Sequence, residues 1–408
     1  MWPALIAVLV VAAVAVELLV TGGGTRNGAG PKAGPTTAPT SPPTTAKPAP
    51  PPKLRTSLLG WRLPVPISQP IVLPGPGDEL VVIGGLTASG TSGDGAFLLS
   101  TSNGSLRLCA DLAAGVHDAS GAVIGEQDFV FGGMASTVTA SVQSFPAPSS
   151  PPASPSAGTH PEPSTSTTAA APTATATVSL PQPRAGSATV MIGTSAYVVG
   201  GSRGTAADGD VLATSDGSNF SLVAHLPVPV RNPAVAAVGG EIYVFGGATT
   251  MLRSRPAASA RPSASAAPST STTLSWAPVA AIQRVDPVTG QATIIGHLPT
   301  PLQGAVAVTL DGHIYVAGGQ GPSGANALVW GFEPDSATVV VAGRLREAVS
   351  GAGAATLGST AWLVGGESGG DLVGSVQALR PVPSSAPPPV PGSSRPSATS
   401  STSLPPAG

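Results

Sequence analysis

Short apolar stretches recur along the chain, and six of them end in a pair of glycines. These pairs are Gly84-Gly85, Gly132-Gly133, Gly200-Gly201, Gly246-Gly247, Gly318-Gly319 and Gly365-Gly366. Successive pairs lie 48, 68, 46, 72 and 47 residues apart, and the two long intervals exceed 47 by 21 and 25 residues. Two internal Pro/Ser/Thr/Ala-rich segments have about those lengths, so the underlying repeat is about 47 residues long. Repeats of this length with strand-like content are typical of β-propeller blades.

A leucine, often followed by proline, precedes each glycine pair at a constant distance. These landmark leucines are Leu63, Leu112, Leu180, Leu226, Leu298 and Leu345. Their distances to the first glycine are 21, 20, 20, 20, 20 and 20 residues. The constant spacing predicts one six-bladed, all-β propeller over residues 56–380.

Each repeat unit is predicted to form four short strands. In the fifth unit a strand over residues 304–310 is followed by the turn Asp311-Gly312 and a second strand over 314–317. The third position before each glycine pair is bulky, and we expect it to pack between neighbouring blades. Its occupants are Val81, Phe129, Tyr197, Tyr243, Tyr315 and Trp362.

The last unit lacks one strand, because only residues 373–379 separate its glycines from a Pro-rich tail. The stretch 56–64 resembles a fourth strand such as residues 220–227. We therefore expect the N-terminal strand to pair with the last blade and close the ring, which removes the open edges of the array.

The segments outside the blades differ in composition from the blades themselves. Residues 1–21 contain an apolar run broken only by Glu17, which predicts a signal or transmembrane segment. Basic residues follow that run rather than precede it, and the positive-inside rule taken literally would keep the chain in the cytoplasm. The preferred interpretation is a protein on the extracytoplasmic face of the cell membrane, or secreted after cleavage. The Pro-rich segments predict a tether over 22–55, loops near 148–169 and 252–275, and a tail over 381–408.

Charge and cysteine content exclude several function classes. Only 9% of the residues are charged, the net charge is -2, and no basic cluster occurs, so a nucleic-acid partner is not expected. Contact with the membrane is expected through the N-terminal segment alone. The single cysteine, Cys109, has apolar neighbours and predicts a buried, inert thiol.

The run Leu298-Pro-Thr-Pro-Leu, followed by Asp311-Gly-His-Ile-Tyr-Val-Ala-Gly-Gly319, resembles the kelch repeat. The turn Asp286-Pro-Val-Thr-Gly290 is similar to that family as well. The resemblance covers residues 56–380, although most units lack the tryptophan that kelch repeats usually carry in their outer strands. It implies a family that includes galactose-oxidase-like copper enzymes, sialic-acid mutarotases and binding scaffolds, so the fold leaves the function open.

One set of candidate site residues follows from the register. The fifth position after each landmark leucine precedes the innermost strand, so its side chains are expected to ring one mouth of the central channel. Its occupants are Ser68, His117, Ala185, Arg231, Gln303 and Ser350, and Arg184 lies one position earlier. These polar residues either bind a ligand or merely solvate the channel entrance.

The candidate chemistry favours binding over catalysis. The histidines are scattered and the tyrosines lie on the packing position, so no metal or cofactor is expected. The preferred prediction is a monomeric binding or scaffold module for a protein or glycan ligand. The alternative is a sugar-acting enzyme, such as a sialic-acid mutarotase, in which Arg184, Arg231, His117 and Gln303 supply acid/base and anion contacts.

Overall fold

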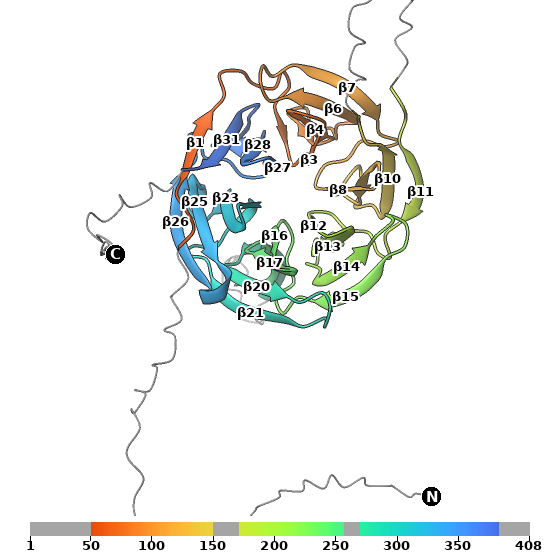
Figure 1. Ribbon diagram of the computed structural model, residues 1–408. Coiled ribbons are helices and arrows are strands. Elements are labelled where there is room, and N and C mark those ends of the chain that lie inside the picture. The colour runs from red at the N-terminus through yellow and green to blue at the C-terminus, as the bar shows by residue number, and fades with distance from the viewer. Residues whose placement is uncertain (1–49, 150–170, 257–269, 383–408) are drawn as a thin grey trace, which may run out of the picture. The chain divides into compact units, whose positions relative to one another are not determined.

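Six antiparallel sheets, each built on four main strands, stand around one axis in the computed structural model, which describes residues 50–149, 171–256 and 270–382 (Figure 1). Blade 1 consists of β3 (Ile71–Pro74), β4 (Glu79–Ile83), β6 (Gly95–Ser100) and β7 (Leu106–Asp111). Blade 2 consists of β8 (Ser120–Ile124), β9 (Gln127–Phe131), β10 (Ser141–Pro146) and β11 (Thr175–Ser179). Blade 3 consists of β12 (Ala188–Ile192), β13 (Ser195–Val199), β14 (Asp210–Thr214) and β15 (Ser221–His225). Blade 4 consists of β16 (Ala234–Val238), β17 (Glu241–Phe245), β20 (Ala281–Val285) and β21 (Ala292–His297). Blade 5 consists of β22 (Gln303–Leu310), β23 (His313–Gly321), β25 (Leu328–Glu333) and β26 (Thr338–Arg344). Blade 6 consists of β27 (Gly353–Leu357), β28 (Thr360–Val364), β31 (Val376–Pro381) and β1 (Leu54–Leu58). The predicted six-bladed propeller is confirmed.

The N-terminal strand closes the ring, as predicted. β1 pairs antiparallel with β31, from Leu54 opposite Pro381 to Leu58 opposite Gln377. β1 begins at Leu54, two residues before the predicted boundary at 56, and β31 extends into the predicted tail by one residue. This arrangement couples the two ends of the described chain, because the Val382 N–H donates to the Lys53 carbonyl over 2.8 Å.

The landmark leucines are buried and make equivalent hydrogen bonds in every blade. The Leu226 N–H donates to the Gly209 carbonyl, immediately before the third strand of blade 3. The Leu298 N–H donates to Ala280 in the same way in blade 4, and Leu345 donates to Ala327 in blade 5. The constant spacing in sequence therefore reflects a repeated connection in which the leucine side chain is buried while its backbone ties the outer strands together.

The glycine pairs touch the neighbouring blade. In blade 5 the Gly319 N–H donates to the Val349 carbonyl, in the segment that leads into blade 6. A Cβ added to Gly318, which has a φ of +70°, would lie 2.5 Å from the same carbonyl oxygen. The first glycine of every pair lies equally close to the next blade. The backbone oxygen that it approaches belongs to the fourth residue after the landmark leucine that leads into that blade. The pair is thus required by the close approach of two backbones as well as by the turn.

The bulky position packs between blades, with one partial exception. Five of its six occupants are buried, and Tyr197 is half-buried. The Tyr243 ring of blade 4 lies 5.5 Å from the ring of Phe332 in blade 5. Glutamines that sequence reasoning did not single out add a polar tie, since buried Gln283 accepts from the Val228 N–H and donates to the Val228 carbonyl. The even-numbered blades 2, 4 and 6 use Gln143, Gln283 and Gln377 in this way.

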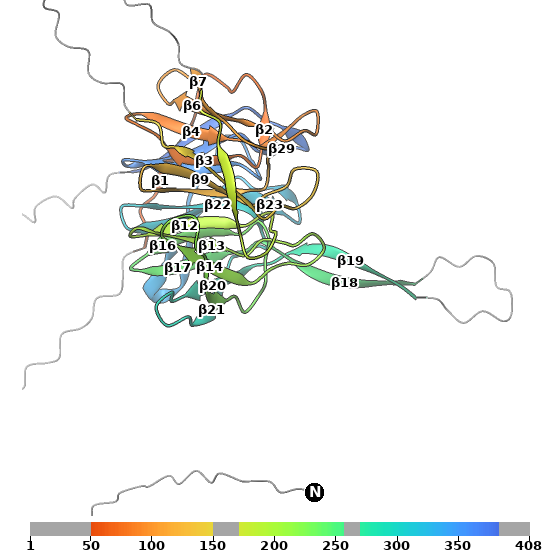
Figure 2. The same cartoon turned by 90° about the vertical axis from the view of Figure 1, so that its right-hand side faces the viewer.

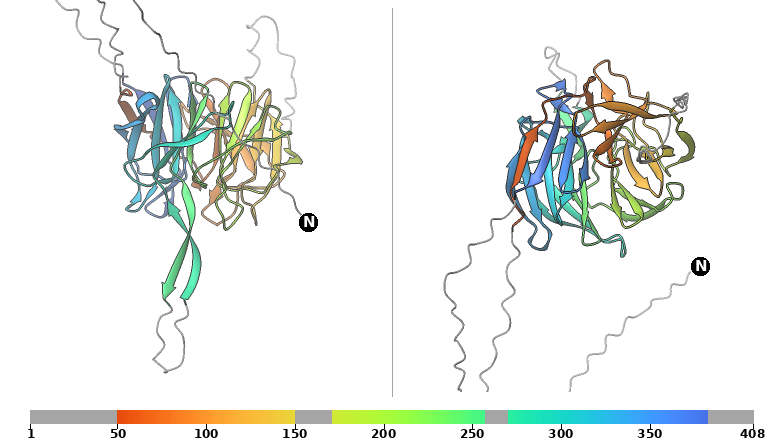
Figure 3. Two further views of the ribbon diagram at one scale, coloured as in Figure 1. Left: turned by 90° about the horizontal axis from the view of Figure 1, so that it is seen from below. Right: turned by 45° about the horizontal axis from the view of Figure 1, so that its top comes forward.

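The second Pro-rich segment differs from the loop predicted near 252–275. Its described ends form a two-stranded ribbon, β18 (Ala248–Pro256) with β19 (Thr270–Pro278), which projects from one face of the propeller (Figures 2 and 3). Their pairing is continuous from Ala248 opposite Pro278 to Pro256 opposite Thr270, whereas composition alone suggested a solvated loop. We call this ribbon the arm. Short pairs complete the described elements: β2 (Ile67–Ser68) with β5 (Leu86–Thr87), β24 (Gly324–Ala325) with β23, and β29 (Glu367–Ser368) with β30 (Asp371–Leu372).

The predicted anchor over residues 1–21 and most of the predicted tether lie outside the described residues. So does the core of the first Pro-rich insert, residues 150–170. Among residues 50–149, 171–256 and 270–382 no helix has the length and apolarity to cross a bilayer.

Candidate functional site

The residues that follow the landmark leucines by five positions lie on one face of the propeller, at the entrance of its innermost strands. Each pairs with the residue directly after the glycine pair of its own blade. The pairs are Ser68 with Leu86, His117 with Met134, Ala185 with Ser202, Arg231 with Ala248, Gln303 with Gln320, and Ser350 with Glu367. We call this end of the channel the mouth. The arm begins at Ala248, so it projects from the same face.

The next residue in each blade forms a ring of backbone around the axis, which we call the collar. Its six members all have positive φ, between 48° and 65°: Gln69, Asp118, Gly186, Asn232, Gly304 and Gly351. Glycine, Asn and Asp adopt this left-handed conformation at the lowest cost, which accounts for five of the six members, and Gln69 is the exception. Five of the members donate an N–H to the carbonyl of the preceding blade's member, over 2.6 to 2.9 Å.

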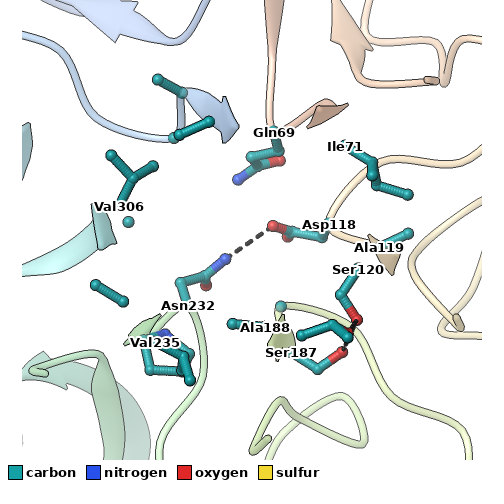
Figure 4. Close-up of a pocket in the computed structure, with 18 of the residues that line it drawn as sticks. Gln69, Ile71, Asp118, Ala119, Ser120, Ser187, Ala188, Asn232, Val235 and Val306 are labelled. Atoms are coloured by element: carbon teal, nitrogen blue, oxygen red, sulfur yellow. Dashed lines mark hydrogen bonds between the residues drawn. The ribbon is translucent and has the colours of Figure 1, made fainter. Parts of the chain in front are cut away.

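The channel behind the collar is lined by both polar and apolar residues. A cavity of about 190 Å³ is lined by the collar and the first residues of the innermost strands, among them Ile71, Ser120, Ala188 and Val306 (Figure 4). Asp118 and Asn232 point toward each other across it, and the Asn232 amide donates to Asp118 Oδ1 over 2.8 Å.

A second, polar pocket of about 140 Å³ opens at the mouth beside the collar. Its side chains come from blades 4, 5, 6 and 1: Gln69, Arg231, Asn232, Gln303, Gln320, Ser350 and Glu367. Ser68 supports its wall by donating its hydroxyl to Glu367 Oε1 over 2.8 Å. We call this the mouth pocket. Three of the predicted residues, Arg231, Gln303 and Ser350, line it, and Ser68 contacts it through Glu367.

The arm reaches the mouth pocket through one aromatic side chain. The Arg231 guanidinium carbon lies 3.9 Å from the centre of the Trp276 ring, a cation–π contact with β19. The Arg231 backbone exchanges two hydrogen bonds with Ala248 at the base of β18. Both contacts hold the arginine against the arm.

The electrostatics of the mouth centre on Asp118. Burial raises the pKa of its carboxyl, while the Asn232 hydrogen bond and the charges of His117 and Arg231 oppose that rise. The nearby Glu367 carboxylate adds to the rise in pKa. Burial also lowers the pKa of Arg231. The mouth therefore holds two acidic groups close to one guanidinium.

Two predicted residues lie apart from the mouth pocket. His117 Nδ1 is hydrogen-bonded to Ser92 Oγ at 2.9 Å, in the connection of blade 1. Arg184 does not reach the mouth at all, which corrects the expectation for that residue. It is fully buried, with Nη2 3.6 Å from an oxygen of Asp208 and 3.9 Å from one of Asp210.

The reason for the correction is the local register. Arg184 stands at the fourth position after its landmark leucine, where the side chain points into the interface between blades. The other blades fill this position with Ile67, Val116, Val230, Leu302 and Val349. The arginine takes an aliphatic place and needs buried carboxylates to balance its charge.

Sequence reasoning missed Gln320 and Glu367, which also line the mouth pocket. Both directly follow a glycine pair, the position that pairs with the predicted residues. The corresponding residues in the other blades are Leu86, Met134, Ser202 and Ala248. The position is therefore not consistently polar along the repeats, and its polar residues in blades 5 and 6 did not stand out as site residues.

Within the described part of the chain no group of three or more His, Cys, Asp or Glu side chains has a geometry that would hold a metal ion. Cys109 is partly buried and its Sγ donates to the Ala96 carbonyl. Burial raises the pKa of its thiol to about 11, with a smaller contribution from the Asp128 charge. A thiol of this kind is a poor nucleophile near neutral pH.

Comparison with known proteins bears on the fold alone. The solved structure of YjhT superimposes with a TM-score of 0.56 and 15% sequence identity, over 77% of this chain and 95% of that chain. The fold is a six-bladed β-propeller. No protein-family model and no curated protein sequence matches the chain.

Proposed function

We propose that this protein is a membrane-tethered, extracytoplasmic propeller of the kelch type that acts as a monomeric binding module. Its ligand, a glycan or a protein, binds at the mouth pocket. The observation that carries the proposal is a set of buried polar atoms without hydrogen-bond partners among the described residues. Gln69 Oε1, Gln303 Oε1 and Arg231 Nε are such atoms, and all three residues line this pocket. Unpaired buried polar groups are costly, and a ligand toward which these side chains turn to form hydrogen bonds would offset that cost.

The topology of blade 6 leaves the mouth free for a ligand. β31 starts beside Val364 at the mouth end and finishes at Pro381 at the opposite end, where it meets Leu54. The described chain therefore enters and leaves the propeller at the face opposite the mouth. An apolar segment over residues 1–21 and a Pro-rich tether over 22–53 would leave the mouth pocket accessible.

The volume of the mouth pocket limits the size of the ligand group that it can bind. Pockets for whole drug-sized ligands measure roughly 300–1,000 Å³. A pocket of about 140 Å³ accommodates one end group, such as a single sugar ring or side chain, with the rest of the ligand on the surrounding face.

A sugar-acting enzyme is the second candidate, and one observation favours it. Asp118 is a carboxyl of raised pKa beside His117, which is a pairing suited to proton transfer. The loss of Arg184 from the mouth removes one anion contact that a sialic-acid mutarotase mechanism was expected to use.

The two candidates are separated by binding and exchange measured on the same protein. We expect glycan-array binding that falls at least about tenfold in Arg231→Ala, with no acceleration of sialic-acid anomer exchange followed by NMR. Arg62→Ala is the matched control, because Arg62 is exposed and its only ion pair among the described residues is one of 3.7 Å with Glu347. Exchange that the protein accelerates and that Arg231→Ala abolishes would replace the binding module with the enzyme.

A further inference from the structure

Arg231 is held in place by the arm, while its charge has no partner among the described residues. Trp276 covers one face of its guanidinium at 3.9 Å, and its backbone is bonded to Ala248. Arg184 and Arg203 each have an aspartate oxygen nearby, at 3.6 and 2.8 Å, whereas no described carboxylate pairs with Arg231. Its half-buried side chain also has a buried Nε without a hydrogen-bond partner. A guanidinium stacked on one face keeps its N–H edge available for a bidentate contact with a carboxylate.

Glu367 is the one acidic side chain among the residues that line the mouth pocket. The buried Ser68 hydroxyl donates to its Oε1 over 2.8 Å, which fixes the carboxylate. No basic side chain of the described chain forms an ion pair with it, and an ionised carboxylate has about four acceptor sites. Asp118 lies behind the collar, where it accepts the Asn232 amide and lines the channel rather than the mouth pocket. Glu367 is therefore the acceptor that a cationic ligand group meets in this pocket.

The fold keeps these two opposite charges apart. Arg231 belongs to blade 4 and Glu367 to blade 6, and the paired residues Gln303 and Gln320 of blade 5 line the pocket with them. Each charged side chain has its own support, Trp276 for one and Ser68 for the other, and the two form no ion pair with each other. Half-buried charges without partners are costly. A ligand that carries both complementary charges satisfies them without adding net charge to the pocket.

We infer that the mouth pocket binds the carboxyl-terminal lysine of a protein ligand, with the α-carboxylate on Arg231 and the ε-ammonium on Glu367. Such a residue carries its two charges at opposite ends of a short aliphatic chain, which suits two partners separated by one blade. Ser68 already occupies one oxygen of Glu367, so a single-point ammonium fits there better than a bidentate guanidinium. The inference rests on the proposed function, because it specifies the ligand of that same pocket. Trp276 is a positioning residue that orients Arg231.

The test is a saturation-transfer NMR titration of the full chain with three matched compounds. Nα-acetyl-lysine has both charges of the chain end, its carboxamide lacks the negative charge, and Nα-acetyl-norleucine lacks the positive one. We expect the first compound to bind at least about tenfold more tightly than either of the others at low ionic strength, as for a hydrogen bond to a charged group.

Each variant should abolish one preference and keep the other. Arg231→Ala should remove the preference for Nα-acetyl-lysine over its carboxamide, and Glu367→Gln should remove the preference over the norleucine compound. Trp276→Leu should reduce the first preference by about threefold, in line with the strength of a cation–π contact, and leave the second unchanged. Glu126→Gln, on an exposed turn of blade 2, and the exposed Arg62→Ala are the matched controls and should keep both preferences.

The outcomes separate the inference from the proposed function. Equal binding of the three compounds, or equal effects of Glu367→Gln and Glu126→Gln, would overturn the inference. Free lysine that binds more tightly than Nα-acetyl-lysine would also overturn it, because the site would then take an amino acid rather than a chain end. In each case glycan or protein binding that Arg231→Ala abolishes would leave the mouth as a binding site. If no lysine compound, glycan or protein binds there, the proposed function fails together with the inference.

Discussion

Asp118 Oδ1 accepts a hydrogen bond of 2.8 Å from Nδ2 of Asn232, although the two residues belong to blades 2 and 4. Blade 3 lies between them and contributes Gly186 to the collar. A Cβ on Gly186 would lie 3.0 Å from the Asn232 amide, so the absence of a side chain leaves room for the bond. The collar thus joins neighbouring blades through its backbone and alternate blades through this pair.

Asn232→Gly tests the side-chain part of this contact without straining the backbone, because glycine already occupies the same collar position in three blades. We expect the pKa of Asp118 to rise further, since the hydrogen bond from Asn232 opposes the effect of burial. The free energy of unfolding should fall by roughly 1.5–3 kcal/mol, as for loss of a hydrogen bond to a charged group. Carboxyl-detected NMR titration and urea unfolding measure the two effects.

Asn103→Gly is the control for that measurement, since Asn103 lies in an exposed turn of blade 1, where its side-chain oxygen accepts the Ser105 N–H. It should leave the pKa of Asp118 unchanged. A rise of equal size in both variants would show that Asn232 has no specific effect on Asp118.

Gly318→Ala should be far more destabilising than Gly312→Ala, although both glycines have positive φ. Either alanine costs roughly 1–2 kcal/mol for the left-handed backbone. At Gly318 the new Cβ also lies 2.5 Å from the Val349 carbonyl oxygen, whereas nothing lies within 4 Å of a Cβ at Gly312. We expect a total loss above about 3 kcal/mol for Gly318→Ala, measured by denaturant unfolding. Equal losses in the two variants would contradict a backbone contact between blades 5 and 6.

Asp128 makes the stability of the propeller depend on pH. Its side chain is 1% exposed, and neither carboxylate oxygen has a hydrogen-bond partner among the described residues. Burial raises the pKa of Asp128 to about 7. Because the folded state holds this proton more tightly than the unfolded chain, the contribution of Asp128 to stability is most favourable at about pH 4 and below, falls as the pH rises to about 7, and is level above that.

Asp128→Asn removes this ionisation. We expect the variant to be more stable than the parent at pH 8, by up to about 4 kcal/mol, which corresponds to a shift of about three pKa units. The advantage should shrink toward pH 4. Thermal unfolding over this pH range checks the prediction, with exposed Asp371→Asn as the control. A constant difference across the range would mean that Asp128 does not titrate in this interval.

Removing Asp208 from the buried Arg184–Asp208 pair should lower the free energy of unfolding more than removing Arg184 does. In Asp208→Asn the fully buried guanidinium keeps only Asp210, at 3.9 Å, and an uncompensated buried charge costs roughly 3 kcal/mol. In Arg184→Leu an aliphatic side chain takes the place that Leu302 fills in its own blade, and Asp208 keeps Arg203 at 2.8 Å. That variant should lose less than about 1 kcal/mol in urea unfolding. A larger loss from Arg184→Leu than from Asp208→Asn would reverse this account.

The sequence by itself determined the number of blades, their register and the closure of the ring. The reason is that each blade repeats a short local pattern: a buried leucine, a bulky packing residue and two glycines at fixed distances. Such a pattern needs no knowledge of distant contacts, because each feature serves the strand turn or blade contact in which it lies. The same register placed Ser68, Arg231, Gln303 and Ser350 on one mouth.

Only the tertiary structure decided which polar residues meet there. Arg184 and Arg231 are both basic and lie one register position apart, yet one is buried between blades and the other faces the mouth pocket. Glu367 joins the pocket because the turn after its glycine pair folds back beside Ser350, and Trp276 of the arm stacks on the pocket residue Arg231. Asp118 and Asn232 are 114 residues apart in the sequence and meet only because the ring curves. Contacts across the axis depend on the closed circle of blades, which a local repeat does not encode.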